Sequence, residues 1–107
     1  MTKTILIVDD EIGICTSLEF ALNAKYNVKS ATSSNNALKM LNKEKIDLCL
    51  LDLKLGKDNG IDLLKKIKNR FPDMVVIMMT AYGTIETSVE AMQQGAYTYL
   101  IKPLSIS

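Results

Sequence analysis

Short apolar runs alternate along the chain with longer segments in which apolar residues recur every three or four positions. Short runs of this kind are typical of buried strands, and the longer spacing is typical of amphipathic helices. We predict five strands, over residues 3–9, 26–31, 46–52, 74–80 and 97–101. Between them we predict four helices, over residues 11–24, 34–45, 60–71 and 84–94, and a loop over residues 53–59.

Capping and helix-breaking residues define the ends of the predicted helices. Ser34 or one of its neighbours is a suitable N-cap for the second helix. Pro72 stops the third helix, because proline lacks a backbone donor and clashes with the preceding turn. The fourth helix begins after Gly83 and ends at Gly95, since glycine is favoured just beyond the last turn.

The alternation of strands and helices indicates an α/β fold. Apolar strands joined by single helices form a parallel sheet that is covered on both faces. We predict a flavodoxin-like, doubly wound sheet of five strands in the order 2-1-3-4-5. The alternation stops at Ser107, just after the fifth strand. We therefore expect one domain over residues 1–107 that lacks its last, fifth helix and exposes apolar sheet surface, with weak stability or aberrant association as the consequence.

Composition excludes several classes of protein. The chain has 107 residues, of which 48% are hydrophobic and 23% charged, so it is expected to be globular. Its apolar runs are too short for a membrane span or a signal peptide. The net charge of +1, without a dominant basic patch, argues against direct nucleic-acid binding by this domain. We expect a cytoplasmic protein with reduced, buried Cys15 and Cys49.

Polar side chains mark the C-terminal ends of the predicted strands. An apolar strand that ends on Asp52 is unexpected, because aspartate is a poor strand former and is costly to bury unpaired. Asp52 is therefore either a cap or turn residue or a reactive group at the rim of the sheet, where sites of such folds lie. The other polar residues at these ends are Asp9, Asp10, Glu11, Thr80 and Lys102.

These residues suggest phosphoryl chemistry. Asp9, Asp10 and Asp52 are expected to converge, because strands 1 and 3 are neighbours in the predicted order. Three carboxylates repel one another, and Lys102 supplies one positive charge, so a hard divalent cation is expected; Mg²⁺ fits best. The Asp52 carboxylate can then attack a phosphoryl group while the cation and Lys102 neutralise charge. Thr80 can donate a hydrogen bond to the same group.

Missing motifs exclude other kinds of chemistry. The chain has no histidine, which excludes Ser-His-Asp and Cys-His catalysis, zinc bound through histidine, and a role as phosphohistidine donor. A nucleotide site is not expected, because there is no GxxxxGK[ST] loop. A flavodoxin-like cofactor binder is disfavoured, because no phosphate loop of serine, threonine and glycine follows the first strand.

Four motifs in one order are together specific for one family. They are VDDE at residues 8–11, LLD at 50–52 with Gly60 eight residues after the aspartate, MTAYG at 79–83 and GAYTYLIKP at 95–103. With these motifs the sequence resembles, along its whole length, the receiver domain of two-component response regulators. The stretch from residue 80 to 103 further resembles the receivers of nitrogen-regulatory-class AAA+ transcriptional activators.

The resemblance implies roles for the acidic residues. Asp52 would be the phosphoacceptor, receiving a phosphoryl group from the phosphohistidine of a sensor histidine kinase, and it would also contact Mg²⁺. Asp10 would bind Mg²⁺ directly and Asp9 partly through water. The backbone carbonyl of Lys54 would be a further ligand. Glu11 would favour the first turn of the following helix by its charge, with contact to the metal shell as the alternative.

The resemblance also implies a switch. Thr80 would be the switch hydroxyl that is drawn to the phosphoryl group, and Tyr99 the switch aromatic that turns inward as Thr80 moves. Lys102 would pair with Asp52 and later with the phosphoryl oxygens, and the Lys102–Pro103 bond would be cis. The alternatives for Thr80 and Tyr99 are a turn threonine and a half-buried strand tyrosine.

Residues beside the phosphoacceptor and the switch hydroxyl would adjust the reaction. Lys54 and Tyr82, each two residues further on, would tune the lifetime of the acyl phosphate, and the small Ala81 would leave room for the phosphoryl group. One position departs from the family, which commonly has proline four residues after the acceptor, where this chain has Gly56. Because glycine loosens the backbone, we expect a more mobile loop over residues 53–59 but unchanged chemistry.

The resemblance predicts a signalling domain and not an enzyme that turns over other substrates. Phosphorylation adds about −1.5 to −2 charges and would shift a two-state equilibrium that controls a downstream output, transcription. The face formed by residues 84–94 and 97–101 would make a homodimer. Two alternatives stay open: a phosphorylation-independent binding module, and an aspartate-nucleophile phosphatase of the haloacid dehalogenase type. The phosphatase is disfavoured because it needs a D-x-D pair, whereas Asp9 and Asp10 are adjacent.

Overall fold

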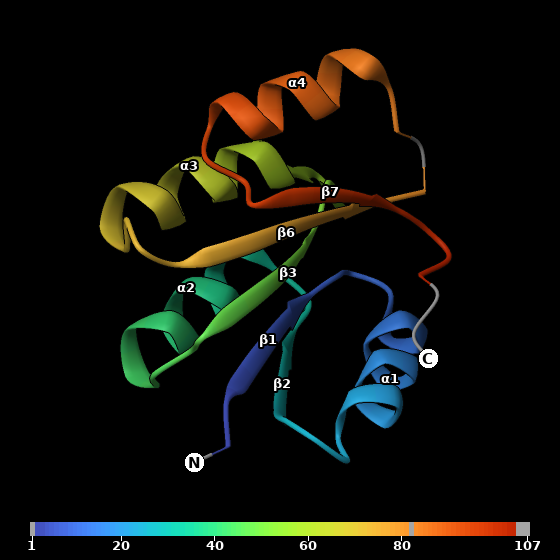
Figure 1. Ribbon diagram of the computed structural model, residues 1–107, viewed down its shortest axis with the longest axis vertical. Helices are drawn as coiled ribbons and strands as arrows, with labels where there is room; N and C mark the ends of the chain where they lie inside the picture. Colours follow the sequence, from blue (N-terminus) through green and yellow to red (C-terminus); the bar gives the residue numbers. More distant parts are fainter. Residues whose placement is uncertain (1, 82, 105–107) are drawn as a thin grey trace.

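A parallel sheet of five strands forms the centre of the computed structural model, which describes residues 2–81 and 83–104 (Figure 1). Its strands are β1 (Thr4–Val8), β2 (Asn27–Ala31), β3 (Leu48–Asp52), β6 (Val75–Thr80) and β7 (Thr98–Ile101). They lie in the order β2-β1-β3-β6-β7, and each is parallel to its neighbours. When only the five strands of this sheet are numbered along the chain, β6 and β7 are the fourth and fifth, and the order is 2-1-3-4-5. The predicted flavodoxin-like topology is therefore confirmed.

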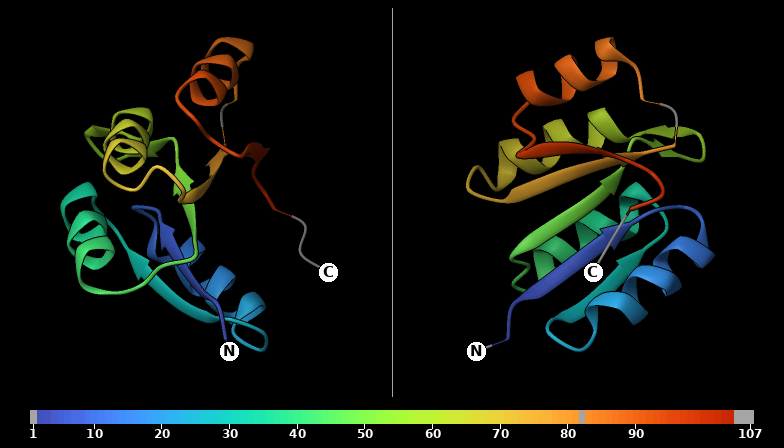
Figure 2. Two further views of the ribbon diagram at one scale, coloured as in Figure 1. Left: turned by 60° about the vertical axis from the view of Figure 1, so that its left-hand side comes forward. Right: turned by 45° about the vertical axis from the view of Figure 1, so that its right-hand side comes forward.

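Helices cover the two faces of the sheet unequally. The helices are α1 (Ile12–Leu22), α2 (Ser34–Lys43), α3 (Gly60–Arg70) and α4 (Ile85–Gln93). Figure 2 shows α2, α3 and α4 on one side of the sheet and α1 on the other. Within the described residues, α1 alone covers its face, and an apolar groove of about 780 Å³ remains open beside it. Among the described residues, no helix follows β7 over this face, which agrees with the four helices predicted from the sequence.

The core is divided by the sheet into two clusters of buried side chains. The larger cluster packs strand residues such as Leu51 and Met78 against Leu64 and Ile67 of α3. The smaller cluster packs Ile7 and other strand residues under α1. Side chains of β1, β3 and β6 alternate between the two clusters, as expected when both faces of a strand are buried. Because both faces of these strands are packed, the strand ends hold the polar residues that follow them, such as Asp9 and Asp52, in defined positions.

The predicted loop over residues 53–59 is more ordered than the sequence indicated. It contains a small antiparallel hairpin of β4 (Lys54–Leu55) and β5 (Asp58–Asn59). The prediction of a plain loop was wrong here, because strands of two residues are too short to show a hydrophobic period. Leu55 is buried and anchors the hairpin to the core. The Asn59 side chain then caps α3 by accepting a hydrogen bond from the Ile61 N–H at 2.8 Å.

The predicted helix ends agree with the structure to within one or two residues. Ser33, a neighbour of the predicted Ser34, is the N-cap of α2 and accepts a hydrogen bond from the Asn36 N–H. Gly95 lies just beyond α4 with φ of +100°, a conformation that favours glycine. Thr84 caps α4 in a reciprocal capping box with Thr87.

Burial also accounts for both cysteines. Cys15 and Cys49 are free and buried, as predicted. Burial raises the pKa of Cys49 to about 12, because a thiolate is disfavoured in an apolar surrounding. In the part of the chain that the structure describes, none of the helices has the length and apolar character needed to span a bilayer.

The first residue of α3 lies unusually close to the backbone of the β3 end. The Gly60 N–H donates to the Leu53 carbonyl at 2.6 Å. A Cβ atom on Gly60 would collide with the Asp52 carbonyl oxygen and would lie 2.8 Å from Leu53 Cα. Only glycine therefore allows α3 to start beside Asp52, whereas a Cβ on Gly13 in α1 would meet nothing within 4 Å.

We predict opposite effects for alanine at these two glycines. Gly60→Ala should lower the free energy of unfolding by roughly 1–3 kcal/mol, because the backbone around Asp52 must move to admit the methyl group. Gly13→Ala should raise it by roughly 0.5 kcal/mol, because alanine is the better helix former. Urea unfolding followed by circular dichroism measures both. Equal effects of the two substitutions would show that the packing at Gly60 is not as tight as described.

Candidate functional site

Three carboxylates meet where β1 and β3 end. In the register of these two strands Val8 pairs with Leu51, so Asp9 and Asp52 follow at the same level. Carboxylate oxygens of Asp9, Asp10 and Asp52 all lie within 4.8 Å of one another. The predicted convergence is therefore present. Beside it lies a cavity of about 220 Å³. Its lining residues are Asp10, Glu11, Asp52, Lys54, Thr80, Ala81 and Lys102.

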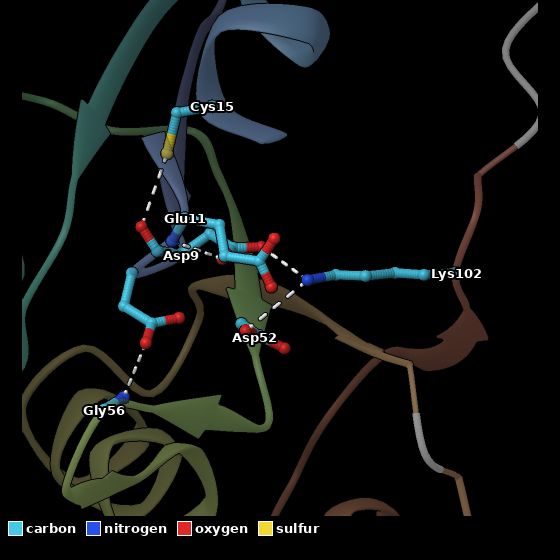
Figure 3. Close-up of polar contacts among 7 residues, drawn as sticks. Asp9, Glu11, Cys15, Asp52, Gly56 and Lys102 are labelled. Atoms are coloured by element: carbon cyan, nitrogen blue, oxygen red, sulfur yellow. Dashed lines mark hydrogen bonds and ion pairs between the residues drawn. The ribbon is translucent and has the colours of Figure 1, made fainter. Parts of the chain in front are cut away.

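Asp9 is the most buried of the three, with no exposed surface. Its Oδ1 accepts a hydrogen bond from the Glu11 N–H at 2.9 Å. Its Oδ2 receives the ammonium of Lys102 at 2.6 Å. The Cys15 thiol donates to the Asp9 backbone carbonyl (Figure 3). A fully buried carboxylate needs such partners, because an unpaired charge would be very costly to bury.

Lys102 joins the far strand of the sheet to this acidic cluster. It follows β7, and Figure 3 shows its side chain reaching toward Asp9 and Asp52. The expected ion pair with Asp52 is present at 3.4 Å, but the contact with Asp9 is shorter. Burial alone would lower the pKa of Lys102, yet the hydrogen bond to Asp9 and the nearby carboxylate charges raise it overall. The Lys102–Pro103 bond is cis, as the resemblance implied.

The carboxyl group of Asp52 has a raised pKa. Burial, and after it the charge of Asp9, raise the pKa of the Asp52 carboxyl from its ordinary 3.8 to about 6. Lys102 and a hydrogen bond from the Lys54 backbone N–H act in the opposite direction but do not outweigh these effects. Sequence analysis singled out the carbonyl of Lys54 as a metal ligand and missed this N–H. Its position depends on the β4–β5 hairpin, which has no hydrophobic period in the sequence.

Asp10 is the exposed member of the cluster. Its Oδ2 accepts a hydrogen bond from the Gly56 N–H at 2.9 Å, across 46 residues of sequence. Glu11 occupies the N-cap position of α1 without a capping hydrogen bond from its side chain, and it lines the cavity. Asp10 and Glu11 thus form the solvent side of the site, whereas Asp9 and Asp52 form its buried side.

Thr80 is buried at the end of β6 and lines the same cavity. Its backbone carbonyl accepts a hydrogen bond from the Lys102 N–H at 2.7 Å, which holds the ends of β6 and β7 together. Ala81 follows as a small lining residue. Tyr82, named as a tuning residue from the sequence, lies outside the described residues. The structure thus brings Thr80 and Lys102 to the acidic edge, as predicted from the strand ends.

Tyr99 lies beside the bend that follows β6. A Cβ on Gly83 would stand 3.3 Å from both the Tyr99 ring and the Thr80 methyl group. The Tyr99 hydroxyl shares a hydrogen bond of 2.9 Å with the Thr87 hydroxyl. Since Thr87 also belongs to the capping box of α4, this bond connects the half-buried tyrosine to the start of that helix. Sequence analysis did not single out Thr87.

The donor set of the cluster suits a hard divalent cation. The converging atoms are carboxylate oxygens, which are the ligands that Mg²⁺ and Ca²⁺ prefer. Among the described residues of the cluster, three carboxylates face the one ammonium of Lys102, so a cation would relieve their mutual repulsion. A buried carboxylate next to a lysine and a hydroxyl can also act as a nucleophile toward a phosphoryl group.

Known proteins share this sequence pattern and fold. The sequence profile described as "Response regulator receiver domain" matches residues 5–107. The transcriptional regulatory protein AlgB of Pseudomonas aeruginosa is 43% identical over 102 residues, and ZraR of Escherichia coli K12 is 46% identical over 101 residues. Each match covers 94% of this chain but 23% of the relative. The chain therefore spans about a quarter of the length of these relatives.

Solved receiver structures superpose closely. A CheY-like receiver domain protein of Methanospirillum hungatei has a TM-score of 0.93 at 36% identity, over 98% of this chain and 85% of that one. A response regulator of Burkholderia pseudomallei was solved with a phosphorylated aspartic acid, a calcium ion and citrate. It has a TM-score of 0.92 at 33% identity, over 97% of this chain and 62% of that one.

One of the similar solved structures agrees with the resemblance to receivers of nitrogen-regulatory-class activators. The receiver domain of NtrX from Brucella abortus has a TM-score of 0.89 at 33% identity, over 95% of this chain and 88% of that one. The profile match, the relatives and the fold agree with the motifs at the strand ends. The chain belongs to the response regulator receiver domain family.

Proposed function

We propose that this receiver is switched by phosphorylation of Asp52, with a sensor histidine kinase as the phosphoryl donor and Mg²⁺ as the required cation. The observation that carries the proposal is the convergence of Asp52 with Asp9 and Asp10, with Lys102 3.4 Å from the Asp52 carboxylate. The Burkholderia pseudomallei regulator, which has the same fold, was solved with a phosphorylated aspartic acid and a calcium ion. Both features support phosphorylation at a cation-binding acidic edge.

The transfer is a displacement at phosphorus. An Asp52 carboxylate oxygen attacks the phosphorus of phosphohistidine and forms an O–P bond. The N–P bond breaks, and its electron pair returns to the imidazole nitrogen of the kinase. The product is an acyl phosphate on Asp52. Lys102 is close enough to pair with the phosphoryl oxygens, and Thr80 lines the same cavity as a hydrogen-bond donor.

The cation would be held by carboxylates of Asp9, Asp10 and Asp52 and by the backbone carbonyl of Lys54. When bound, Mg²⁺ supplies positive charge that offsets the carboxylates and the phosphoryl oxygens. The raised pKa of Asp52 is in line with this assignment, because burial and the charge of Asp9 outweigh the effect of Lys102, and a bound cation would favour the ionised carboxylate. Lys54 and Tyr82 would shield the acyl phosphate from water and lengthen its lifetime.

The signal would pass from the cavity to the α4 and β7 face. Movement of Thr80 toward the phosphoryl group would let the Tyr99 ring turn inward, which breaks its hydrogen bond to Thr87. Large apolar side chains are exposed on this face, and they offer a surface for homodimers and for output to transcription. These side chains are Ile85, Val89, Met92, Tyr97 and Ile101.

In this role the domain is a cytoplasmic phosphoacceptor that promotes its own phosphorylation and dephosphorylation. It does not turn over other substrates. The phosphorylation-independent binding module and the aspartate-nucleophile phosphatase are distinguished from this role by the fate of the phosphoryl group. A module of the first kind stays unmodified, and a phosphatase releases phosphate from many substrate molecules.

Acetyl phosphate should phosphorylate the purified chain at one position. We expect the intact mass to increase by one phosphoryl group in the presence of Mg²⁺ and to stay unchanged in EDTA. Asp52→Asn should abolish the increase, because the nucleophilic carboxylate is gone. Asp73→Asn should retain it, because that exposed aspartate precedes β6 at the opposite edge of the sheet. A folded wild-type chain that gains no mass, or an Asp52→Asn variant that does, would contradict the proposal.

The raised pKa of Asp52 predicts how stability depends on pH without metal. Because this pKa is higher in the folded than in the unfolded chain, ionisation of Asp52 disfavours folding. Its contribution to the free energy of unfolding falls as the pH rises from about 4 to about 6 and then stays low. In EDTA at pH 7.5, Asp52→Asn should therefore be more stable than the wild type, by up to about 3 kcal/mol.

Urea unfolding at several pH values measures this effect. The difference between Asp52→Asn and the wild type should shrink below about pH 4, where the carboxyl group is protonated in both states. Mg²⁺ should stabilise the wild type more than the variant, since the variant has lost one carboxylate ligand. An Asp52→Asn variant that is less stable than the wild type at pH 7.5 would show that Lys102 compensates the Asp52 charge fully.

A further inference from the structure

The turn of the β4–β5 hairpin contacts the acidic edge through its backbone. Gly56 and Lys57 form the two-residue connection between Leu55 and Asp58, which pair across the hairpin. The Gly56 N–H donates to Asp10 Oδ2 at 2.9 Å. Figure 3 shows this hydrogen bond at the end of the cluster that lies away from Lys102. The exposed carboxylate of Asp10 is thus held by a backbone group from a separate part of the chain.

The contact depends on an unusual backbone conformation. Gly56 has φ of +60°, and among the described residues positive φ occurs only at glycines. A two-residue hairpin with positive φ at its first position favours glycine there. A proline would have φ near −65° and would lack the N–H altogether. Space is not the obstacle, since a Cβ on Gly56 would meet Asp10 Oδ2 at an ordinary 3.8 Å.

We propose that Gly56 is a positioning residue for the divalent cation: its N–H, presented by the left-handed backbone, fixes the Asp10 carboxylate for cation binding. This inference rests on the proposed function, which assigns the cation to the three aspartates. Asp10 needs such a contact more than its neighbours do. Asp9 is held by Glu11 and Lys102, and Asp52 by Lys102 and Lys54, whereas Asp10 is exposed and would otherwise rotate freely.

The hydrogen bond serves the cation in two ways. It engages one oxygen of Asp10 and leaves the other oxygen as a cation ligand, and it restrains the side chain beforehand, so less rotamer entropy is lost on cation binding. It also places a partial positive charge beside the cluster before the cation arrives, which reduces repulsion among the carboxylates. Cation binding is thereby coupled to the conformation of the hairpin that also carries Lys54.

Four substitutions distinguish the contribution of the Gly56 N–H from that of its positive φ. Gly56→Pro removes the N–H and also prevents positive φ. Gly56→Ala keeps the N–H but disfavours positive φ, and Gly56→Asn keeps the N–H and tolerates positive φ. Gly95→Ala is the matched control, because Gly95 has φ of +100° and lies beside Lys68, before β7 and therefore at the opposite edge of the sheet.

The readout is the dissociation constant of MgCl₂, measured by titration of ¹H–¹⁵N amide spectra of the unphosphorylated chain. We expect about tenfold weaker binding for Gly56→Pro and about threefold for Gly56→Ala, as the loss of one charge-assisted hydrogen bond implies. Gly56→Asn and Gly95→Ala should stay within about twofold of the wild type.

The outcomes distinguish the inference from the proposed function. Wild-type affinity in Gly56→Pro, or equal losses in Gly56→Pro and the control Gly95→Ala, would overturn the role of Gly56 alone. Tighter binding in Gly56→Pro would also overturn it, by showing that the N–H competes with the cation. A folded wild type that binds no Mg²⁺, or binding that Asp10→Asn leaves unchanged, would overturn both the cation site and the role of Gly56.

Discussion

The buried ion pair between Asp9 and Lys102 is the constraint on which the site depends. Asp9 has no exposed surface, so its charge must be met inside the protein, and Lys102 meets it at 2.6 Å. The same ammonium lies 3.4 Å from Asp52 and therefore sets the position of the proposed nucleophile. Breaking the pair would leave a buried charge without a partner and would release the end of β7 from β1. The contact between Asp9 and Lys102 is therefore needed both for the stability of the fold and for the proposed chemistry at Asp52.

Part of this arrangement follows from strand order. Parallel strands place their C-terminal residues at one edge, so carboxylates that follow β1 and β3 must meet once these strands are neighbours. Once the order 2-1-3-4-5 is taken from the flavodoxin-like fold, the sequence was sufficient to predict the acidic convergence of Asp9, Asp10 and Asp52 and the approach of Lys102. Hydrophobic runs are a strong signal, and each of these residues stands directly at the end of one or just beyond it.

Other parts of the site were beyond prediction from sequence. The hairpin of β4 and β5 has no hydrophobic period, so the hydrogen bonds from Lys54 and Gly56 could not be placed. These contacts use backbone groups, and residue identity says little about where a backbone N–H points. Glycine at position 56 suggested only a loose loop, whereas the structure gives it φ of +60° and a defined partner. Thr87 was missed because hydroxyl contacts between a helix start and a strand leave no motif.

The connection from Lys102 to Asp9 spans 93 residues of sequence and crosses two intervening strands. Contacts between such distant segments form late, because the whole chain must be arranged before they are possible. Until β7 docks, β1 and β3 carry an acidic edge without its lysine. A partly folded chain in which β7 has not docked therefore presents carboxylates that lack this positive charge and repel anions. Docking of β7 supplies the counter-charge, so the polar edge is complete only when both ends of this long-range contact have been brought together.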